Sequence, residues 1–412
     1  MTEPTAYPSG TDLRLLLQNC QCGDDLMRKP GAASPLVRKA IQSVGFQDLT
    51  EANYAFDEGG YTLAIVLAES HLVIHTWPEF DNLVLVDISV CNYLRPNRER
   101  TLQLGEEVCR VFQPKQHLVE ESSMAPRLQD KLIAGHGYYV EIDKLVDSRK
   151  SEFQSITVAD TPVFGRSLVI DGVLQVSEAD SAFYHEPLVH VPLLAHPNPQ
   201  SVMICGGGDG VAAKDALLHP SVERCVIVDI DPEVVEVSRQ TLQTLHQGAL
   251  DDPRVEIRIQ NAKEHLAHLD RKYDVILIDS TDPVGCGEAL FTQDFYQNLS
   301  RCLADDGWLS LHVGSPYIIE AESARAAAKV YQAFHRADPY LQYVPSYASV
   351  MGFMLCQNRD ERLPGPGAIQ ERIEERGLDK LELLTPETYA AMFAIPPKLR
   401  HVFPHVASRV FA

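Results

Sequence analysis

The chain has 412 residues, which is more than one hydrophobic core usually spans, so we expect two or three domains. Hydrophobic residues make up 45% and charged residues 23%, a composition typical of globular and not of disordered proteins. The formal net charge of −21 disfavours nucleic acid and anionic membranes as partners but is compatible with a cationic substrate. The same acidity is also typical of proteins that use charge only to stay soluble.

Further features of the sequence indicate the cellular setting. No apolar run approaches the roughly 20 residues that a membrane helix needs, and the opening MTEPTAYPSG lacks a basic segment followed by an apolar signal core. Nine cysteines, an odd number, argue against a disulfide framework. Cys20 and Cys22 stand close together, but no second Cys or His pair completes a zinc site. We therefore expect a cytoplasmic protein without a bound metal.

The first part of the chain has the pattern of an α+β domain. Short β-branched runs predict strands, and helix-like stretches lie between and around them. The strands are expected at residues 61–68, 71–76 and 83–90, and the helices at 36–44 and 98–112. Helices covering one face of an antiparallel sheet would give a sandwich-like domain. The polar stretch from Gln113 to Arg127 is predicted to be irregular, so the first domain is expected at residues 1–127.

The second part, residues 128–412, predicts a small β cap at 128–190 and an α/β core at 191–412. In the cap, turns are expected at Phe164-Gly165-Arg166 and Ile170-Asp171-Gly172. In the core, strands and helices alternate, with strands at 201–205, 225–230, 255–259 and 273–278 and helices at 211–218 and 232–246. This alternation is typical of a doubly wound, largely parallel sheet of the Rossmann-like methyltransferase type.

A glycine-rich loop, GGGDG at 206–210, follows a predicted strand and opens a helix. Gly206 and Gly208 would let the backbone approach a ligand at a helix N-terminus, although such a loop can also be a simple tight turn. The next strand ends with Asp229, which could accept hydrogen bonds from both ribose hydroxyls. Because Asp209 would repel a pyrophosphate, a nucleoside with a cationic amino group and no phosphate fits this loop better than NAD.

Two acids, Asp279 and Asp282, follow the fourth strand of the core. Ligands of this fold bind outside the carboxyl ends of the strands, where both side chains are expected. Both could instead cap a loop, as Asp before Pro often does.

The second part resembles the spermidine synthase family from about Gly137 to Cys356. The motifs that carry the resemblance are, in chain order, Ser151-Glu152-Phe153-Gln154, Ile170-Asp171-Gly172, Tyr184-His185-Glu186, GGGDG, the run from Asp279 to Pro283, Leu290-Phe291 and Gly352-Phe353-Met354-Leu355-Cys356. The resemblance implies a site for decarboxylated S-adenosylmethionine formed by Gln154, Gly206, Gly208, Asp209, Asp229, Asn261 and Ala262. It also implies that Asp279 is the base and that the diamine is held by Tyr184, Asp282 and Tyr347, with His185 nearby.

The chemistry of aminopropyl transfer agrees with these implied roles. A diamine nitrogen must attack the carbon beside a sulfonium, and an alkylamine with a pKa of about 10 has to lose a proton first. Asp279 could take that proton, and Asp282 could bind the distal ammonium and fix the line of attack. Asp209 would also repel the carboxylate of intact S-adenosylmethionine. The same acids argue against the alternative of a methyltransferase.

Three departures from the family pattern concern this site. Asp229 stands where the family usually has Glu, and Asn261 where it usually has Asp. The run Tyr347-Ala348-Ser349-Val350 replaces a Tyr-Pro-Ser-Gly segment beside the acceptor pocket. The identity of the amine acceptor therefore stays open.

The first part contains a dense polar motif, Leu67-Ala68-Glu69-Ser70-His71 followed by Ile74-His75-Thr76-Trp77-Pro78-Glu79. Its alternation alone fits a half-exposed strand with polar outward positions. The segment also resembles the bacterial and archaeal class of S-adenosylmethionine decarboxylases over roughly residues 10–110. The resemblance implies that Ser70 attacks the Glu69 carbonyl and that elimination, assisted by His75, leaves a pyruvoyl group at residue 70. A pyruvoyl carbonyl supplies the electron sink that pyridoxal phosphate otherwise provides.

Cys91 corresponds to the proton-donating cysteine of that family, although a lone Cys at a strand end is more often a buried hydrophobe. Several positions depart from that family: Asp12 stands where a His is usual, Val90-Cys91-Asn92 replaces Thr-Cys-Gly, and Tyr61-Thr62-Leu63 replaces a smaller stretch. The substrate could therefore be arginine or ornithine in place of S-adenosylmethionine. A non-catalytic first domain is the other alternative. The leading prediction is a bifunctional enzyme of polyamine biosynthesis that forms a homo-oligomer, a dimer or larger, and binds no metal.

Overall fold

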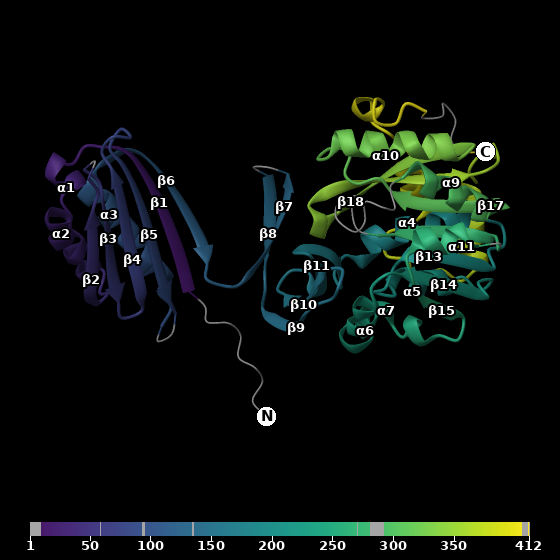
Figure 1. The fold of residues 1–412 in the computed structure, drawn as a ribbon, viewed down its shortest axis with the longest axis horizontal. Helices are drawn as coiled ribbons and strands as arrows, with labels where there is room; N and C mark the ends of the chain where they lie inside the picture. The colour runs from purple at the N-terminus through teal and green to yellow at the C-terminus, as the bar shows by residue number, and fades with distance from the viewer. Residues whose placement is uncertain are drawn as a thin grey trace. The chain divides into compact units, whose positions relative to one another are not determined.

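The computed structural model describes residues 10–57, 59–92, 95–133, 136–269, 271–280, 292–405 and 411. The chain divides into two compact units, unit 1 at Met1–Pro126 and unit 2 at Arg127–Ala412 (Figure 1). Each unit has a hydrophobic core of its own. Among the described residues, no helix combines the length and apolar character needed to cross a membrane.

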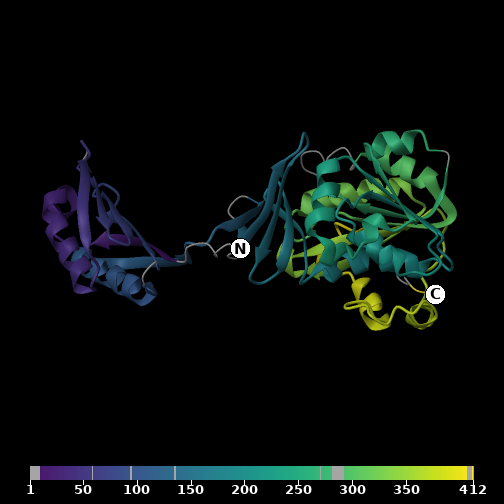
Figure 2. The same cartoon turned by 90° about the horizontal axis from the view of Figure 1, so that it is seen from below.

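Unit 1 contains a six-stranded antiparallel sheet. Its helices cover one face of this sheet, as Figure 2 shows. In spatial order the strands are β2 (Asp48–Ala55), β3 (Tyr61–Leu67), β4 (Ser70–Trp77), β5 (Leu83–Cys91), β1 (Gly10–Cys20) and β6 (Pro114–Ser123). The helices are α1 (Asp24–Arg28), α2 (Pro30–Ser43) and α3 (Arg98–Phe112). Leu72 and Ile74 of β4 are buried in the core under these helices, so His71 and His75 lie on the other face of the sheet.

The sequence prediction for unit 1 was wrong at one edge of this sheet. The stretch from Gln113 to Arg127 was expected to be irregular, whereas β6 pairs with β1 along most of it. Nearly every residue of β6 is exposed, so the strand lacks the alternation of apolar and polar residues that reveals a half-buried strand. The expected helix at 36–44 begins earlier, at Pro30, because proline is well tolerated in the first turn of a helix.

Unit 2 begins with the hairpin β7 (Arg127–Ile133) and β8 (His136–Glu141) and a four-stranded antiparallel sheet. In spatial order that sheet has β12 (Val173–Ser177), β11 (Gly165–Ile170), β10 (Ser155–Thr161) and β9 (Lys144–Lys150). The predicted turn at Asp171-Gly172 joins β11 to β12, and both residues have positive φ, 50° and 83°. Two successive positive φ angles are typical of the tight type I′ hairpin turn.

The remainder of unit 2 is a seven-stranded, mostly parallel sheet, and the predicted fold class is confirmed. Its spatial order is β15 (Val255–Ile259), β14 (Arg224–Asp229), β13 (Ser201–Gly206), β16 (Tyr273–Asp279), β17 (Leu303–His312), β19 (Ser349–Gln357) and β18 (Arg336–Val344). The helices include α4 (Ser181–Ala195), α5 (Val211–Leu217), α6 (Pro232–Thr241), α7 (Gln243–His246), α8 (Ala262–Ala267), α9 (Gln293–Cys302) and α10 (Glu320–Ala333). Ile204 and Cys205 of β13 point into separate core clusters, so both faces of the sheet are buried.

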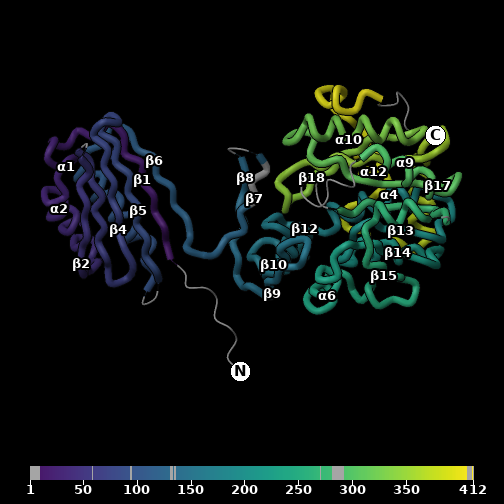
Figure 3. Tube along the Cα trace, in the orientation of Figure 1, coloured from purple at the N-terminus to yellow at the C-terminus, as the bar shows by residue number. Residues whose placement is uncertain are grey.

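The C-terminal helix α11 (Pro366–Glu375) contacts α4, and α12 (Pro386–Met392) contacts α11 and β18. Figure 3 traces this C-terminal part of the chain in yellow. Arg372 and Arg376 donate hydrogen bonds to five carbonyls at and just beyond the end of α4, those of residues 193–197. Near its start, Glu186 accepts three backbone N–H groups, from residues 382–384. The C-terminal segment therefore holds both ends of the helix that carries Tyr184 and His185.

Candidate functional site

In unit 2, the glycine loop lies against the end of β16. Gly206 is in register with Asp279, and the N–H of Gly207 donates to the Asp279 carbonyl at 2.9 Å. Gly206 has a φ of 82°, and a Cβ atom on it would lie 1.9 Å from that carbonyl oxygen. Only glycine permits both this conformation and this close approach. The loop and Asp279 are thus fixed against each other by the backbone.

Asp229 closes the next strand and is held by the same loop. One of its carboxylate oxygens accepts from the Gly208 N–H at 2.9 Å and the other from the Asp231 N–H at 2.9 Å. Burial raises the pKa of Asp229 to about 6, although these two N–H groups oppose the shift. Each oxygen retains a second lone pair, so the carboxylate can still accept hydrogen bonds from ribose hydroxyls.

Asp231, two residues further on, links the β cap to the core. It is fully buried and accepts from Gln154 Nε2 at 2.9 Å and from Ser151 Oγ at 2.6 Å. It also caps α6 by accepting from the Glu233 N–H at 3.0 Å. Asp231 therefore links Gln154 of the cap to the end of the strand that carries Asp229.

Three ionisable side chains meet where β13, β16 and α4 come together. Single ligand atoms of His185, Asp209 and Asp279 all lie within 4.8 Å of one another. His185 Nδ1 is 3.0 Å from the Ser181 carbonyl, which directs Nε2 toward Asp279 Oδ2 at 3.8 Å. Nε2 and Oδ2 are both buried without a hydrogen-bond partner in the described part of the chain. A cation or a hydrogen-bond donor placed between them, such as an amine or a metal ion, would satisfy both.

The protonation of Asp279 is set by its surroundings. Burial raises the pKa of Asp279 to about 7, His185 opposes the shift, and the nearby Asp209 and Asp229 add to it. A hydrogen bond from Tyr184 lowers the pKa to a smaller extent. A carboxylate whose pKa lies near neutrality can act as a general base, because it can both accept and release a proton at physiological pH.

Aromatic rings form one wall of this site around Tyr184. The ring of Tyr184 contacts those of His312, Tyr347 and Phe353 at centroid distances of 6.1, 5.8 and 5.6 Å. Tyr347 belongs to a short 3₁₀ helix, Pro345–Tyr347, and its hydroxyl donates to the Gln175 carbonyl of the β cap. The wall therefore joins residues of the cap and of the core.

In unit 1, the carbonyl of Glu69 has two donors. It accepts from the Cys91 N–H at 3.0 Å and from the Cys91 thiol at 2.9 Å. The Glu69 side chain, 9% exposed, faces two arginines, with Arg95 at 3.6 Å and Arg100 at 4.0 Å. Asn97 in turn holds Cys91 by donating to its carbonyl at 2.9 Å. The carbonyl and the side chain of Glu69 are both fixed in place.

Ser70, the next residue, has an unusual backbone conformation. Its φ is 153°, a region that residues with a side chain rarely adopt, so the Glu69–Ser70 junction is strained. Such strain costs of order 1–3 kcal/mol and lowers the barrier to any step that releases it. The Ser70 hydroxyl lies 3.1 Å from His71 Nδ1.

His75 is on the same strand but not beside Ser70. Five residues of extended chain separate the two, roughly 17 Å at about 3.3 Å per residue. His75 Nδ1 is instead 2.9 Å from the Thr62 hydroxyl, and its ring stacks on Trp77 at 5.7 Å between centroids. Within one chain, the structure brings Ser70 together with Glu69 and Cys91 but not with His75.

Comparison with known proteins identifies both units. Residues 181–363 match the spermine/spermidine synthase domain, residues 127–178 the spermidine synthase tetramerisation domain, and residues 14–123 S-adenosylmethionine decarboxylase. A polyamine aminopropyltransferase from Nitrosomonas europaea is 36% identical over 278 residues, which cover 67% of this chain and 86% of that protein. The chain belongs to the polyamine aminopropyltransferase family. Unit 1 adds an S-adenosylmethionine decarboxylase domain, so two enzyme families are fused in one chain.

Other relatives agree with this assignment. The polyamine aminopropyltransferase of Pyrobaculum calidifontis is 37% identical over 263 residues, 62% of this chain and 91% of that protein. A crystal structure of spermidine synthase with the transition-state analogue AdoDATO superimposes with a TM-score of 0.64 at 29% identity, covering 68% of this chain and 96% of that one. Spermidine synthase from Thermotoga maritima gives 0.63 at 28%, covering 68% and 95%. The match to a tetramerisation domain indicates a homo-oligomer.

Two predicted residues of the aminopropyltransferase site lie on α8. Asn261 caps this helix, its side-chain oxygen accepting from the Lys263 N–H at 2.9 Å, and Ala262 follows it in a buried position. The Asn261 oxygen keeps a second lone pair for a ligand. Asp282 lies outside the described residues, as does the rest of the run at 281–291.

Sequence reasoning missed three residues that shape these sites. His312 ends β17, and its Nε2 lies 2.8 Å from the Ser280 carbonyl, directly after Asp279. Thr62 holds His75, and Asp231 holds Gln154. Position at the carboxyl end of a parallel strand could have indicated His312, because ligands bind at that edge. No sequence signal marks Thr62.

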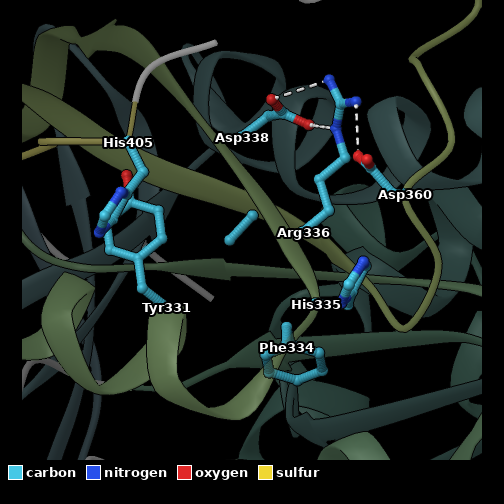
Figure 4. Close-up of a pocket in the computed structure, with 8 residues that line it drawn as sticks. Tyr331, Phe334, His335, Arg336, Asp338, Asp360 and His405 are labelled. Atoms are coloured by element: carbon cyan, nitrogen blue, oxygen red, sulfur yellow. Dashed lines mark hydrogen bonds and ion pairs between the residues drawn. The ribbon is translucent and has the colours of Figure 1, made fainter.

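A cavity of about 320 Å³ in unit 2 (Figure 4) is lined by none of the site residues described above. It is lined by Tyr331, Phe334, His335, Arg336, Ala337, Asp338, Asp360 and His405. Arg336 is already paired with the carboxylates of Asp338 and Asp360, so the charge available for an anion is neutralised. We assign no function to this cavity.

Proposed function

We propose that the chain makes an aminopropyl donor and then uses it. Unit 1 would decarboxylate S-adenosylmethionine, and unit 2 would transfer the aminopropyl group of the product to a diamine such as putrescine, giving spermidine and methylthioadenosine. One observation supports the proposed decarboxylase activity of unit 1. The Glu69 carbonyl accepts hydrogen bonds from the N–H and the thiol of Cys91, directly beside the strained Ser70. The fusion of the two families supports the order of the two reactions.

The transferase step follows from the buried acids of unit 2. Asp279, with its pKa raised by burial, would take a proton from the diamine nitrogen, which then attacks the aminopropyl carbon. The new N–C bond forms as the C–S bond breaks, and its electron pair remains on the sulfur of methylthioadenosine. The buried Nε2 of His185 lies 3.8 Å from Asp279 and would stabilise the reacting amine by hydrogen bonding. Asp209 would bind the ammonium of the donor.

Self-processing of unit 1 would begin at Ser70. Its hydroxyl oxygen attacks the Glu69 carbonyl carbon, and the negative charge that develops on the carbonyl oxygen meets the two donors of Cys91. Collapse breaks the peptide bond and leaves an ester. Loss of the Ser70 α-proton and of the Glu69 carboxylate, followed by hydrolysis with release of ammonia, leaves a pyruvoyl group on residue 70.

The surroundings of Ser70 fit such a group. Cys91 and the arginines around Glu69 provide donors for carbonyl and carboxylate oxygens at this point. Once formed, the pyruvoyl group supplies the electron sink that decarboxylation needs. The Cys91 thiol lies beside residue 70 and would return a proton to the substrate carbon.

We propose that His75 assists from a second copy of the chain. Within one chain, about 17 Å of extended strand separates His75 from Ser70, too far for proton transfer. The face of the unit 1 sheet that carries His71 and His75 is not covered by helices α1, α2 or α3 and is called the helix-free face. This obstacle would be removed in a homo-oligomer, a dimer or a tetramer, if two unit 1 domains met through their helix-free faces. The match of residues 127–178 of unit 2 to a tetramerisation domain supports an oligomer of the chain.

Mass spectrometry of the purified protein tests the decarboxylase half. Processing would yield chains 1–69 and 70–412, the second blocked at its N-terminus and lighter by one ammonia than a serine terminus. The Ser70→Ala variant should stay whole. An unbroken wild-type chain that releases no carbon dioxide from any amino acid would leave unit 1 as a non-catalytic module.

The substrate of unit 1 is tested by carbon dioxide release from S-adenosylmethionine, arginine and ornithine in turn. We expect S-adenosylmethionine to be preferred. Asp12, which accepts a hydrogen bond from Ser89 at 2.6 Å on the helix-free face, could pair with the guanidinium of arginine, the ammonium of ornithine or the sulfonium of S-adenosylmethionine. If carbon dioxide is released from arginine or ornithine alone, unit 1 would instead make the amine acceptor that unit 2 uses.

A further inference from the structure

The Ser70 hydroxyl forms a hydrogen-bond contact with a ring nitrogen of the next residue, His71. Its Nδ1 lies 3.1 Å from Ser70 Oγ, within the reach that a general base needs. His75 Nδ1 is occupied by Thr62 and lies far along the strand. In the single chain His71 is exposed on the helix-free face, the face through which two unit 1 domains are proposed to meet.

The contact between Ser70 and His71 depends on the strained backbone. Side chains of neighbouring residues in a regular strand point to opposite faces of the sheet and do not meet. Ser70 has a φ of 153°, outside the β region, and this departure lets its hydroxyl approach the imidazole of the next residue. The conformation that strains the scissile bond therefore also presents the nucleophile to a base.

An acid lies in the same row across the sheet. His71 is directly opposite Ser89 on β5, and Ser89 is directly opposite Asp12 on β1. The Ser89 hydroxyl donates to Asp12 at 2.6 Å. Neighbouring strands are about 4.8 Å apart, so His71, Ser89 and Asp12 form one continuous polar row on the helix-free face of the sheet.

We propose that His71 is the base that starts the self-cleavage of unit 1, an inference that rests on the proposed self-processing. The Ser70 O–H proton moves to His71 Nδ1 as Oγ bonds to the Glu69 carbonyl carbon, and the carbonyl electrons move to the oxygen held by Cys91. When this tetrahedral intermediate collapses, the C–N bond between Glu69 and Ser70 breaks and the imidazolium returns its proton to the Ser70 nitrogen. The Glu69 acyl group is now an ester on the Ser70 oxygen, the Ser70 nitrogen is a free amino group still bonded to its own Cα, and His71 is neutral again.

A hydroxylamine trap separates this step from the elimination that follows. Hydroxylamine cleaves an ester but leaves a peptide bond intact, so it releases chain 1–69 only from protein in which the acyl shift has occurred. The His71→Ala variant should remain an unbroken amide and form ester at least about 100-fold more slowly than wild type. The His75→Ala variant should instead accumulate the ester and be cut by hydroxylamine at Glu69.

Two further arms keep the test decisive. His71 is exposed, so its replacement should leave unit 1 folded, and added imidazole should restore ester formation in His71→Ala, which a purely structural role would not allow. His117→Ala, an exposed histidine of β6, is the matched control and should process normally. Ester formation at the wild-type rate in His71→Ala overturns the role of His71 alone. A wild-type chain that forms neither ester nor pyruvoyl group overturns the self-processing itself.

Discussion

Asp279 should destabilise the folded aminopropyltransferase unit at neutral and alkaline pH. Burial raises its pKa from an ordinary 3.8 to about 7. Because the folded pKa lies above the unfolded one, the native state binds the proton more tightly, and stability is lost as pH rises from about 4 to about 7. Three pKa units at about 1.36 kcal/mol each correspond to about 4 kcal/mol at pH 8, but to only about 2 kcal/mol at pH 5.

The Asp279→Asn variant tests this magnitude because the amide is nearly isosteric and carries no charge. We expect its free energy of unfolding to exceed that of the wild type by about 4 kcal/mol at pH 8, and this excess to fall by about half at pH 5. A domain of this size gains roughly 2–4 °C in melting temperature per kcal/mol, so a shift of roughly 10 °C is expected at pH 8. Aminopropyl transfer should be abolished in the same variant.

Urea unfolding followed by tryptophan fluorescence measures the change. The chain has two tryptophans, and Trp308 is 4% exposed in the core of unit 2, so a Trp77→Phe background isolates the signal of that unit. Asp305→Asn, on a side chain that is 73% exposed, is the matched control and should change stability by less than about 0.5 kcal/mol. An Asp279→Asn variant no more stable than wild type at pH 8 would refute the desolvation argument.

Other predictions concern the remaining contacts. Gly206→Ala should abolish transfer because its Cβ would lie 1.9 Å from the Asp279 carbonyl, whereas Gly367→Ala, with open space around it, should retain full activity in the same assay. Cys91→Ala should slow chain cleavage about 100-fold on a gel time course, since the Glu69 carbonyl loses its thiol donor. The kcat/KM of transfer should rise with pH through about 7, as Asp279 loses its proton, and a flat profile would contradict its role as base. Arg376→Ala should destabilise unit 2 by about 3 kcal/mol in urea unfolding, because it removes a half-buried guanidinium that donates hydrogen bonds to three carbonyls.

Much of unit 2 could be predicted because parallel strands order its residues. Buried strands read as continuous apolar runs, and their carboxyl ends meet at one edge, so Asp209 and Asp279 had to be neighbours in space. His185 joined them only through a family resemblance, since it lies on a helix before the sheet begins. Asp231 was assigned no role because its partners, Gln154 and Ser151, are brought to it by the folding of a separate cap.

Unit 1 was harder to predict because its site depends on backbone geometry. The motif placed Ser70 and His75 close together in sequence, but an extended strand turns five residues into roughly 17 Å. Cys91 is far from Glu69 in sequence, and only antiparallel pairing brings its N–H and thiol to the Glu69 carbonyl. The positive φ of Ser70 has no signature in residue type, because glycine would be the expected residue there.

Each unit holds one group in a conformation or environment that costs free energy: a strained backbone at Ser70 in unit 1 and a desolvated carboxylate at Asp279 in unit 2. The two differ in whether this cost can be removed. Under the proposed self-processing, the strain at Ser70 belongs to a bond that breaks once, so it would drive a single irreversible step, and unit 1 would afterwards no longer carry its cost. The desolvation of Asp279 could not be released in this way, because under the proposed transfer mechanism the carboxylate would act as a base in every turnover. Mature protein should therefore be more stable than its precursor in unit 1, while unit 2 keeps its destabilising acid. Comparing urea unfolding of the wild type with that of an unprocessed Ser70→Ala chain would reveal a difference confined to unit 1.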